Sequence, residues 1–211
     1  MQIATNEVEV IEQGQISLQA EASQRPYVLR VLSKDDLPAV MELQSKLITS
    51  LSQKDLYVPI PEAEMLFLLE GNGEALGLFI DNRMYAACSL LWRIEYENNM
   101  ARELNFSQEE LDRVAQLELS LVDLELRGHK LQYKMATILA ERARRTKAPR
   151  YLFTTVSPFN YPSIETVTAM GLQIAHLCKM YYDWDRYVVY RDYINPVRLD
   201  TSRPVMVKNT S

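Results

Sequence analysis

The sequence predicts an α/β protein in which one mixed β-sheet is covered by helices on both faces. Short apolar runs rich in β-forming residues alternate with segments whose apolar residues recur at helical spacing. Two runs in the first half follow one another as a hairpin, which a purely parallel, doubly wound sheet does not contain. With 211 residues, 47% of them hydrophobic and 24% charged, the chain has the composition of one globular domain with tails.

The first third of the chain predicts a tail, a strand and two helices. Residues 1–26 are polar and weakly patterned, which predicts a tail with room for a short strand. The run YVLRVL at 27–32 predicts a strand. The next helix begins at the cap residue Ser33 and carries one apolar stripe, which Gln44 interrupts. A proline-containing loop at 59–61 then leads to a short helix.

The middle of the chain predicts a hairpin, a loop and a further strand. Two apolar runs within 71–92 are joined at Asp81–Asn82, whose asparagine tolerates a positive φ. Residues 95–106 are polar and predict a loop, and a short helix capped by Ser107 follows. The run LELSLVDL at 117–124 predicts the next strand.

The last part of the chain predicts alternating helices and strands and then a hairpin. These elements are a helix over 131–145, a strand at 151–156, a helix from about Pro162 that stops at Gly171, a hairpin across Asp183–Asp185 and a loose tail over 196–211. The aromatic run YYDWDRYVVY, at 181–190, could line an acceptor pocket or a dimer face, or pack a core.

Charge, apolar runs and cysteine content weigh against several classes of protein. The net charge of −5 argues against nucleic acid as a partner, because a nucleic-acid binder normally has a basic face. The apolar runs are far shorter than the roughly 20 residues of a membrane span. Because the N-terminus also has no secretory signal, we expect a cytoplasmic protein with no membrane partner. Cys88 and Cys178 predict two reduced core thiols, and the two distant histidines predict no metal site.

One turn, ELRGHK at 125–130, has the layout of an anion site. It joins the predicted strand at 117–124 to the helix at 131–145, and such a turn offers unpaired backbone N–H groups to an anion. His129 and Lys130 stand where a phosphate-binding turn usually has its second glycine. The same pattern also fits an ordinary strand–turn–helix with an exposed basic turn.

This turn resembles the coenzyme loop of the GNAT superfamily of acyl-CoA-dependent N-acyltransferases. In that family the fourth strand leads into Val-x-Pro-x-Tyr-Arg-Gly-x-Gly, and Val122, Arg127 and Gly128 match this pattern in place. In the looser form, Gln/Arg-x-x-Gly-x-Gly/Ala, Glu125 and Lys130 depart from the first and last positions.

A second motif lies at the expected separation from the first. The family often has an asparagine, then a small residue, an aromatic residue and a Gly-Phe pair. The residues at these places are Asn160, Ser163, Val167 and Gly171-Leu172. The resemblance covers roughly residues 27–190, and both motifs fall on the expected elements.

The resemblance implies a fold and an activity. The fold is a central, mostly antiparallel sheet with helices on both faces and a V-shaped splay between strands four and five, here in a domain over 27–195. The implied reaction moves an acyl group, usually acetyl, from coenzyme A to an amine of a small molecule or peptide. The partners are then acyl-CoA and an amine acceptor, with no metal, and a homodimer is left open.

The resemblance also implies the coenzyme-binding residues by position. The pantetheine arm would run along 121–123 and the pyrophosphate would sit at 127–132. Asn160 would bond the arm, although it suits a helix cap equally well. We expect Lys130 at an ordinary helical φ with its side chain outward, since a positive φ there would damage the site. The full set is Leu121, Val122, Asp123, Arg127, Gly128, His129, Lys130, Leu131, Gln132, Asn160 and Ser163.

Glu118 is the implied general base. It lies four residues before Val122, so strand alternation places it on the same face as Val122 and Ser120. Burial among leucines would raise the pKa of its carboxyl toward the useful range. The alternative is a solvated glutamate on the polar face of an amphipathic strand.

The usual general acid is missing, which keeps a second function open. Val167 stands at the position of the family's tyrosine, and Tyr161 and Tyr133 are possible substitutes that could equally be packing or surface residues. The rival functions are a CoA-binding sensor without turnover and an interaction protein whose coenzyme groove is closed.

Overall fold

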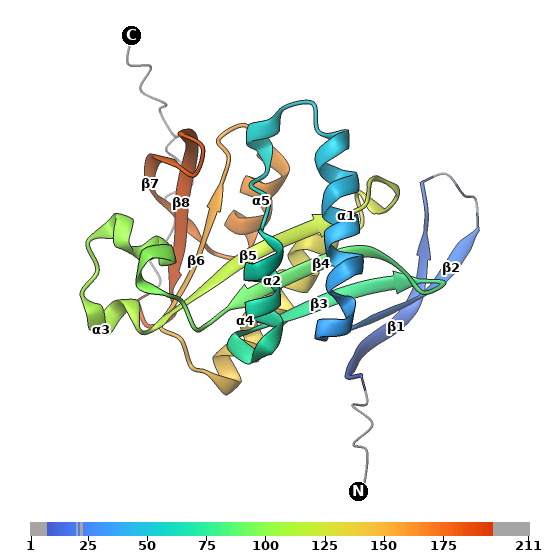
Figure 1. The fold of residues 1–211 in the computed structure, drawn as a ribbon, viewed down its shortest axis with the longest axis horizontal. Helices are drawn as coiled ribbons and strands as arrows, with labels where there is room; N and C mark the ends of the chain where they lie inside the picture. The colour runs from blue at the N-terminus through green and yellow to red at the C-terminus, as the bar shows by residue number, and fades with distance from the viewer. Residues whose placement is uncertain (1–7, 20, 22, 196–211) are drawn as a thin grey trace, which may run out of the picture.

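One mixed β-sheet with helices on both faces forms the protein. The computed structural model describes residues 8–19, 21 and 23–195. Eight strands form a single sheet in the order β1-β2-β3-β4-β5-β6-β8-β7 (Figure 1). Neighbouring strands are antiparallel except β5 and β6, which run parallel. The predicted fold class, a mostly antiparallel mixed sheet with helices on both faces, is confirmed.

The elements have the following bounds. The strands are β1 (Val10–Ser17), β2 (Gln24–Val31), β3 (Gly73–Ile80), β4 (Arg83–Leu91), β5 (Val114–Val122), β6 (Tyr151–Val156), β7 (Gln173–Met180) and β8 (Trp184–Asp192). The α-helices are α1 (Leu37–Ser50), α2 (Glu62–Phe67), α3 (Gln108–Leu111), α4 (Leu131–Thr146) and α5 (Tyr161–Ala169). The short turns that matter below are η2 (Lys54–Leu56), η4 (Tyr96–Asn98), η5 (Met100–Leu104) and η6 (Leu124–Leu126).

Part of the predicted N-terminal tail is a full strand. Strand β1 pairs with β2 along its length, and β2 begins at Gln24, inside the predicted tail. The polar sequence of β1 hid this strand, because an edge strand buries little of its surface. An ion pair joins it to α4: Lys134 Nζ lies 2.5 Å from Glu12 Oε1. Residues 1–7 of the predicted tail, and the C-terminal tail at 196–211, lie outside the described residues.

The two faces of the sheet carry separate cores. In Figure 1, α1 and α2 lie in front of the sheet, and α4 and α5 lie behind it. The front core packs Val40 and Met65 against Leu119, and the rear core packs Met135 and Leu139 against the other face. No helix among the described residues is long and apolar enough to cross a membrane.

Of three predicted connections, two differ in detail and one is confirmed. The predicted loop at 95–106 contains η4 and η5, which help to cover the aromatic end of β6. Asp81 and Asn82 both have positive φ, so the β3–β4 turn is at the predicted place. The last hairpin turns at 181–183 and not across Asp183–Asp185, because β8 begins at Trp184.

Strands β5 and β6 separate after a short paired stretch. They share three residue pairs, from Val114 opposite Tyr151 to Gln116 opposite Phe153. The hydroxyl of Thr154 then donates a 2.9 Å hydrogen bond to the carbonyl oxygen of Leu117. Both strands continue past this point, and the strands diverge in Figure 1. Because β1 is an extra strand, β5 and β6 are the fourth and fifth strands of the predicted pattern, which placed its splay there.

Glu118 is the extra residue of a β-bulge in β5. Ser89 is opposite Leu119 and Leu90 is opposite Leu117, so Glu118 has no partner of its own in β4. The bulge breaks the alternation of the strand, because Leu117 packs into the rear core and Leu119 into the front core.

Candidate functional site

A large cavity opens where β5 and β6 separate. Its volume is about 1270 Å³. It lies between the splayed strands, α5, the loop from α1 to α2, the segment with η4 and η5, and the β7–β8 turn. Residues that matter for chemistry line it: Tyr57, Glu64, Glu118, Ser120, Gln132, Thr154, Thr155, Asn160, Ser163, Val167, Tyr181 and Arg186. This volume exceeds that of a typical small-molecule pocket, so it has room for two reactants.

The loop between α1 and α2 is held over the cavity by a buried glutamine. Gln44 Nε2 donates to the carbonyl oxygen of Ile60 at 3.0 Å, and the N–H of Ile60 donates back to Gln44 Oε1 at 2.9 Å. The hydroxyl of Tyr57 donates to the same Oε1 at 2.6 Å. The polar residue that interrupts the apolar stripe of α1 therefore fixes one wall of the cavity.

The Glu118 carboxyl is in the environment of a general base. It lines the cavity at the bulge and accepts a 2.7 Å hydrogen bond from Gln116 Nε2. Burial raises the pKa of Glu118 to about 7; the bond from Gln116 opposes the rise and the carboxylate of Glu64 adds to it. The carboxyl can therefore gain and lose a proton near neutral pH.

The bulge interrupts the strand alternation on which the predicted face of Glu118 rests. Val122 packs against the rear core, and the Glu118 carboxyl accepts a hydrogen bond from Gln116. The carboxylate of Glu64, on the front helix α2, raises the pKa of Glu118 through its charge. The bulge shifts the alternation of β5 by one residue, so the face of Val122 does not determine the face of Glu118.

A tyrosine from the aromatic run at 181–190 lines the same cavity as this carboxyl. Tyr181, at the β7–β8 turn, has a half-exposed side chain, but its hydroxyl lies 3.3 Å from Thr155 Oγ1 in the cavity. Burial raises the pKa of this hydroxyl above its ordinary value, and the nearby charge of Glu118 adds to the rise. Tyr181 therefore stays protonated and can donate a hydrogen bond or a proton.

The tyrosines considered from the sequence lie elsewhere. Tyr161 and Tyr133 are exposed, and neither lines this cavity. Val167 lines the cavity, so the position of the family's tyrosine faces the site with an apolar side chain. The structure thus brings Glu118 and Tyr181 together and leaves both predicted substitutes on the surface.

The turn before α4 offers free N–H groups. In the described part of the chain, no group accepts a hydrogen bond from the backbone N–H of Gly128, His129 or Lys130. The first N–H groups of the 16-residue helix α4 also lack intrahelical acceptors. The helix dipole adds a partial positive charge at this end. The turn therefore has the donors that an anion such as a pyrophosphate requires.

Lys130 does not have the predicted backbone conformation. Its φ is +55°, in the left-handed region, and that of Gly128 is +90°. A left-handed residue at the N-cap of α4 reverses the chain between the exposed turn and the helix. The expectation of an ordinary helical φ is therefore wrong. The Lys130 side chain is nevertheless exposed as predicted, and among the described residues the N–H groups at 128–130 have no acceptor, so the positive φ does not remove the donors that an anion needs.

The N-terminal segment anchors this turn. A ring nitrogen of His129, Nε2, lies 2.8 Å from the carbonyl oxygen of Ser17 in β1. The backbone N–H of Gln19 donates to the carbonyl oxygen of Glu125 at 2.9 Å. The predicted phosphate neighbour His129 thus holds the turn to the sheet edge.

Asp123 fixes the start of the turn from inside. Its carboxylate is fully buried and lies 2.5 Å from Lys46 Nζ and 3.4 Å from Arg83 Nη2. Its other oxygen accepts from the N–H of Glu125 at 3.2 Å, which caps η6. Its side chain is therefore engaged within the protein.

The backbone of β5 is open toward the splay at alternate residues. The N–H of Asp123 donates to the carbonyl oxygen of Tyr85 in β4 at 2.8 Å. Because backbone groups alternate sides along an antiparallel strand, Leu121 also faces β4, and Ser120 and Val122 face the gap. Of the predicted range 121–123, Val122 therefore offers its backbone to a ligand in the splay.

The other predicted coenzyme residues divide into two groups. Gln132, Asn160 and Ser163 line the cavity, and Gln132 Nε2 donates to Ser163 Oγ at 3.3 Å. Asn160 caps α5 by accepting from the N–H of Ser163 at 3.3 Å, and its Nδ2 donates to the carbonyl oxygen of Leu56. The residues outside the cavity lining lie along the end of β5 and the turn: Leu121, Val122, Asp123, Arg127, Gly128, His129, Lys130 and Leu131.

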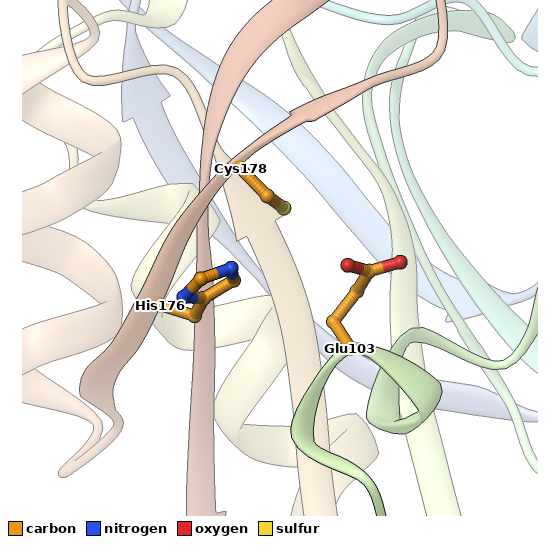
Figure 2. A group of neighbouring side chains, drawn as sticks. All are labelled: Glu103, His176 and Cys178. Atoms are coloured by element: carbon orange, nitrogen blue, oxygen red, sulfur yellow. The ribbon is translucent and has the colours of Figure 1, made fainter.

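A separate group of potential metal ligands includes Glu103, which lines the cavity, and two residues of β7 that do not. His176 and Cys178 of β7 point toward Glu103 of η5, and the ligand atoms lie within 4.8 Å of one another (Figure 2). Burial raises the pKa of the Cys178 thiol to about 11, and the carboxylate of Glu103 adds to the rise through its charge and a hydrogen bond. The donor types suit zinc, but the thiol and carboxylate already satisfy each other.

Comparison with solved structures identifies the fold. A GNAT-family acetyltransferase from Streptococcus pneumoniae matches with a TM-score of 0.60 and 13% identity, over 79% of this chain and 98% of its own. The ribosomal-protein-S18-alanine N-acetyltransferase from Escherichia coli matches with a TM-score of 0.56 and 15% identity, over 78% of this chain and 92% of its own. A Salmonella typhimurium protein described as an acetyltransferase was solved with its cofactor acetyl-CoA. It matches with a TM-score of 0.60 and 13% identity, over 83% of this chain and 98% of its own.

This chain therefore has the fold of the GNAT acetyltransferases. The predicted resemblance is confirmed at the level of the fold. No protein-family model matches the sequence, and no curated protein matches it in sequence. The activity must therefore be argued from the site itself.

Proposed function

We propose that this protein is an acyl-CoA-dependent N-acyltransferase that moves an acetyl group from acetyl-CoA to a primary amine of a small molecule or peptide. The observation that carries the proposal is the position of Glu118. A carboxyl whose pKa is near neutral lies in the same cavity as the open strand of a GNAT-type splay. The solved acetyltransferases with this fold support the same class of reaction.

The coenzyme would occupy the splay and the turn before α4. The free backbone groups of Ser120 and Val122 would bond the amides of the pantetheine arm, as an additional strand does. The pyrophosphate would accept hydrogen bonds from the N–H groups at 128–130 and at the start of α4. Gly128 allows the close approach, and the exposed side chains of Arg127 and Lys130 add positive charge nearby.

The reaction would proceed by direct attack. Glu118 takes a proton from the acceptor ammonium, directly or through a water molecule, and the amine nitrogen then attacks the thioester carbonyl carbon. The C–N bond forms as the C–S bond breaks, so the products are an N-acetyl amide and coenzyme A. Tyr181, held protonated in the same cavity, is the candidate to protonate the leaving thiolate. The second proton, which the nitrogen loses as the amide forms, would restore the tyrosine hydroxyl, so the net reaction releases only the proton taken by Glu118.

The charges around the cavity suit a cationic amine. Carboxylates line it from α2, from the segment of η4 and η5 and from the bulge: Glu64, Glu95, Glu97, Glu103 and Glu118. These groups would raise the local concentration of an ammonium and orient it before deprotonation.

A CoA-binding protein without turnover is the second candidate, favoured by one observation. Val167 lines the cavity where the family's tyrosine would stand, and Tyr181 reaches the site from a different element. If Tyr181 does not replace that acid, the site would hold the coenzyme without efficient transfer.

Two measurements test the proposal in order. The first is thermal unfolding with acetyl-CoA or CoA, with ATP and NAD as controls; a ligand at 100 times its Kd should stabilise the fold by about 2.7 kcal/mol. The second is release of free thiol from acetyl-CoA with a panel of primary amines. Glu118→Gln should abolish thiol release and spare CoA binding, whereas Glu165→Gln, an exposed change on α5, should affect neither. Binding without turnover by any amine would favour the second candidate, and no stabilisation by CoA would refute both.

A further inference from the structure

Arg186 is a buried arginine in the wall of the cavity. It lies on β8, its side chain lines the cavity, and only 5% of the residue is exposed. Its Nη1 donates to the carbonyl oxygen of Asp55 at 2.9 Å, but its Nε is buried without a hydrogen-bond partner. Among the described residues it forms no ion pair.

This arrangement is unusual for a buried cation. A charge removed from water normally has a carboxylate partner, and other arginines of this protein follow that rule. Arg142, which is more exposed, contacts both Glu9 and Glu74, and Arg150 contacts Asp192. The Asp55 carboxylate favours the charged form of Arg186 from a distance, yet the direct contact is to its backbone carbonyl. The guanidinium is therefore left with an unused donor.

Several contacts place Arg186 on the acceptor side of the proposed site. Its bond to Asp55 connects β8 to η2, in the loop between α1 and α2. Its guanidinium carbon lies 6.0 Å from the centre of the Tyr181 ring. Both charges act on the pKa of the Tyr181 hydroxyl, which the carboxylate of Glu118 raises and the guanidinium of Arg186 lowers. Glu118 and the guanidinium of Arg186 therefore face the same part of the cavity. Neither residue belongs to the turn proposed to hold the pyrophosphate.

We propose that Arg186 binds a carboxylate of the acceptor, so that the acceptor is an amino acid or a peptide-like molecule carrying both an amine and a carboxylate. This inference rests on the proposed transferase function. A guanidinium with a free N–H matches a carboxylate in geometry and charge. A phosphate dianion fits less well, because Glu64 and Glu118 line the same cavity and would repel a second negative charge. Glu118 then receives the amine of a zwitterionic acceptor while Arg186 holds its other end.

The competing role for Arg186 is a clamp that holds η2 to β8. A clamp would need only the bond to the Asp55 carbonyl and would be indifferent to the charge of a ligand. The same strand provides a matched control, since Arg191 Nη1 donates to the carbonyl oxygen of Met170 at 2.8 Å and does not line this cavity.

Binding of product-like molecules tests the inference without turnover. N-acetyl amino acids keep the carboxylate and lack the free amine, and their carboxamides are neutral analogues of the same shape. Their Kd values are measured by calorimetry with the CoA-saturated protein, for the wild type, Arg186→Met, Arg186→Lys and Arg191→Met. We expect at least one acid to bind the wild type and Arg191→Met about tenfold more tightly than its carboxamide. Arg186→Met should lose this preference, and Arg186→Lys should keep only part of it.

Two results would overturn the inference. The first is equal binding, or no binding, of acids and carboxamides by the wild-type protein, which needs no variant to fold. The second is a preference for the acid that survives in a folded Arg186→Met protein. Thiol release separates this failure from failure of the proposed function. Equal turnover of amino acids and their carboxamides would refute the carboxylate site alone, and an intact binding preference without any turnover would refute the transferase alone.

Discussion

Replacing Glu118 with glutamine should make this protein more stable at high pH while it removes the base. The pKa of Glu118 is raised from 4.5 to about 7 by burial, which corresponds to about 3 kcal/mol. Between these values the folded protein holds a proton that the unfolded chain has released, so stability falls as the pH rises. Above about pH 7 the folded state carries the full penalty of the buried charge. Glutamine resembles the neutral carboxyl and can still accept the hydrogen bond from Gln116.

Urea denaturation of the two proteins at low and high pH measures this difference. We expect nearly equal free energies of unfolding at about pH 4.5 and an advantage of up to about 3 kcal/mol for Glu118→Gln at about pH 8.5. Glu165→Gln, on the exposed side of α5, should show no such pH-dependent gain. A variant that is less stable than the wild type at the higher pH would refute the claim that Glu118 is a buried, destabilised carboxylate.

Three further predictions concern the reaction and the turn. The kcat/KM of the wild type should rise with pH to a plateau with a midpoint near 7, the pKa of Glu118, and a flat profile between pH 6 and 8 would exclude that residue as the base. Tyr181→Phe should lower kcat by at least about tenfold and leave the Kd of acetyl-CoA unchanged in calorimetry, and an unchanged kcat would remove Tyr181 from proton transfer. Because residues 128 and 130 both have positive φ, Lys130→Gly should raise the free energy of unfolding in urea by about 1 kcal/mol, and Gly128→Ala should lower it by about the same amount. A lower free energy of unfolding in both variants would show that the Lys130 side chain stabilises the turn.

The elements with strong apolar patterns could be predicted from the sequence. The hairpin of β3 and β4, the strand β6 and the helix α4 each have a periodicity that belongs to one kind of structure. Strand β1 lacks that signal because it is a polar edge strand, paired with β2 and joined by an ion pair to Lys134 of α4, which is distant in sequence. Local pattern carries no information about such contacts.

The site was predictable only where it depends on local sequence. Gly128 and the free N–H groups follow from a strand, a turn and a helix in succession. The left-handed conformation of Lys130 could not be predicted in this way, because lysine rarely adopts it and contacts with β1 fix the turn. The bulge at Glu118 depends on the register with β4. Tyr181 and Arg186 lie in the aromatic run for which the sequence left an acceptor pocket, a dimer face and a packed core open, and only the fold shows that both residues line the cavity.

Strand β1 limits how far this protein can be shortened. A fragment beginning at Tyr27, where the resemblance to the family starts, would lose the Ser17 carbonyl that contacts His129 and the Gln19 amide that contacts Glu125. It would also leave β2 as an open sheet edge, able to pair with a second copy and aggregate. Poor coenzyme binding by such a fragment would then reflect the lost support of the turn, so the choice of starting residue decides whether the protein's ligand can be found at all.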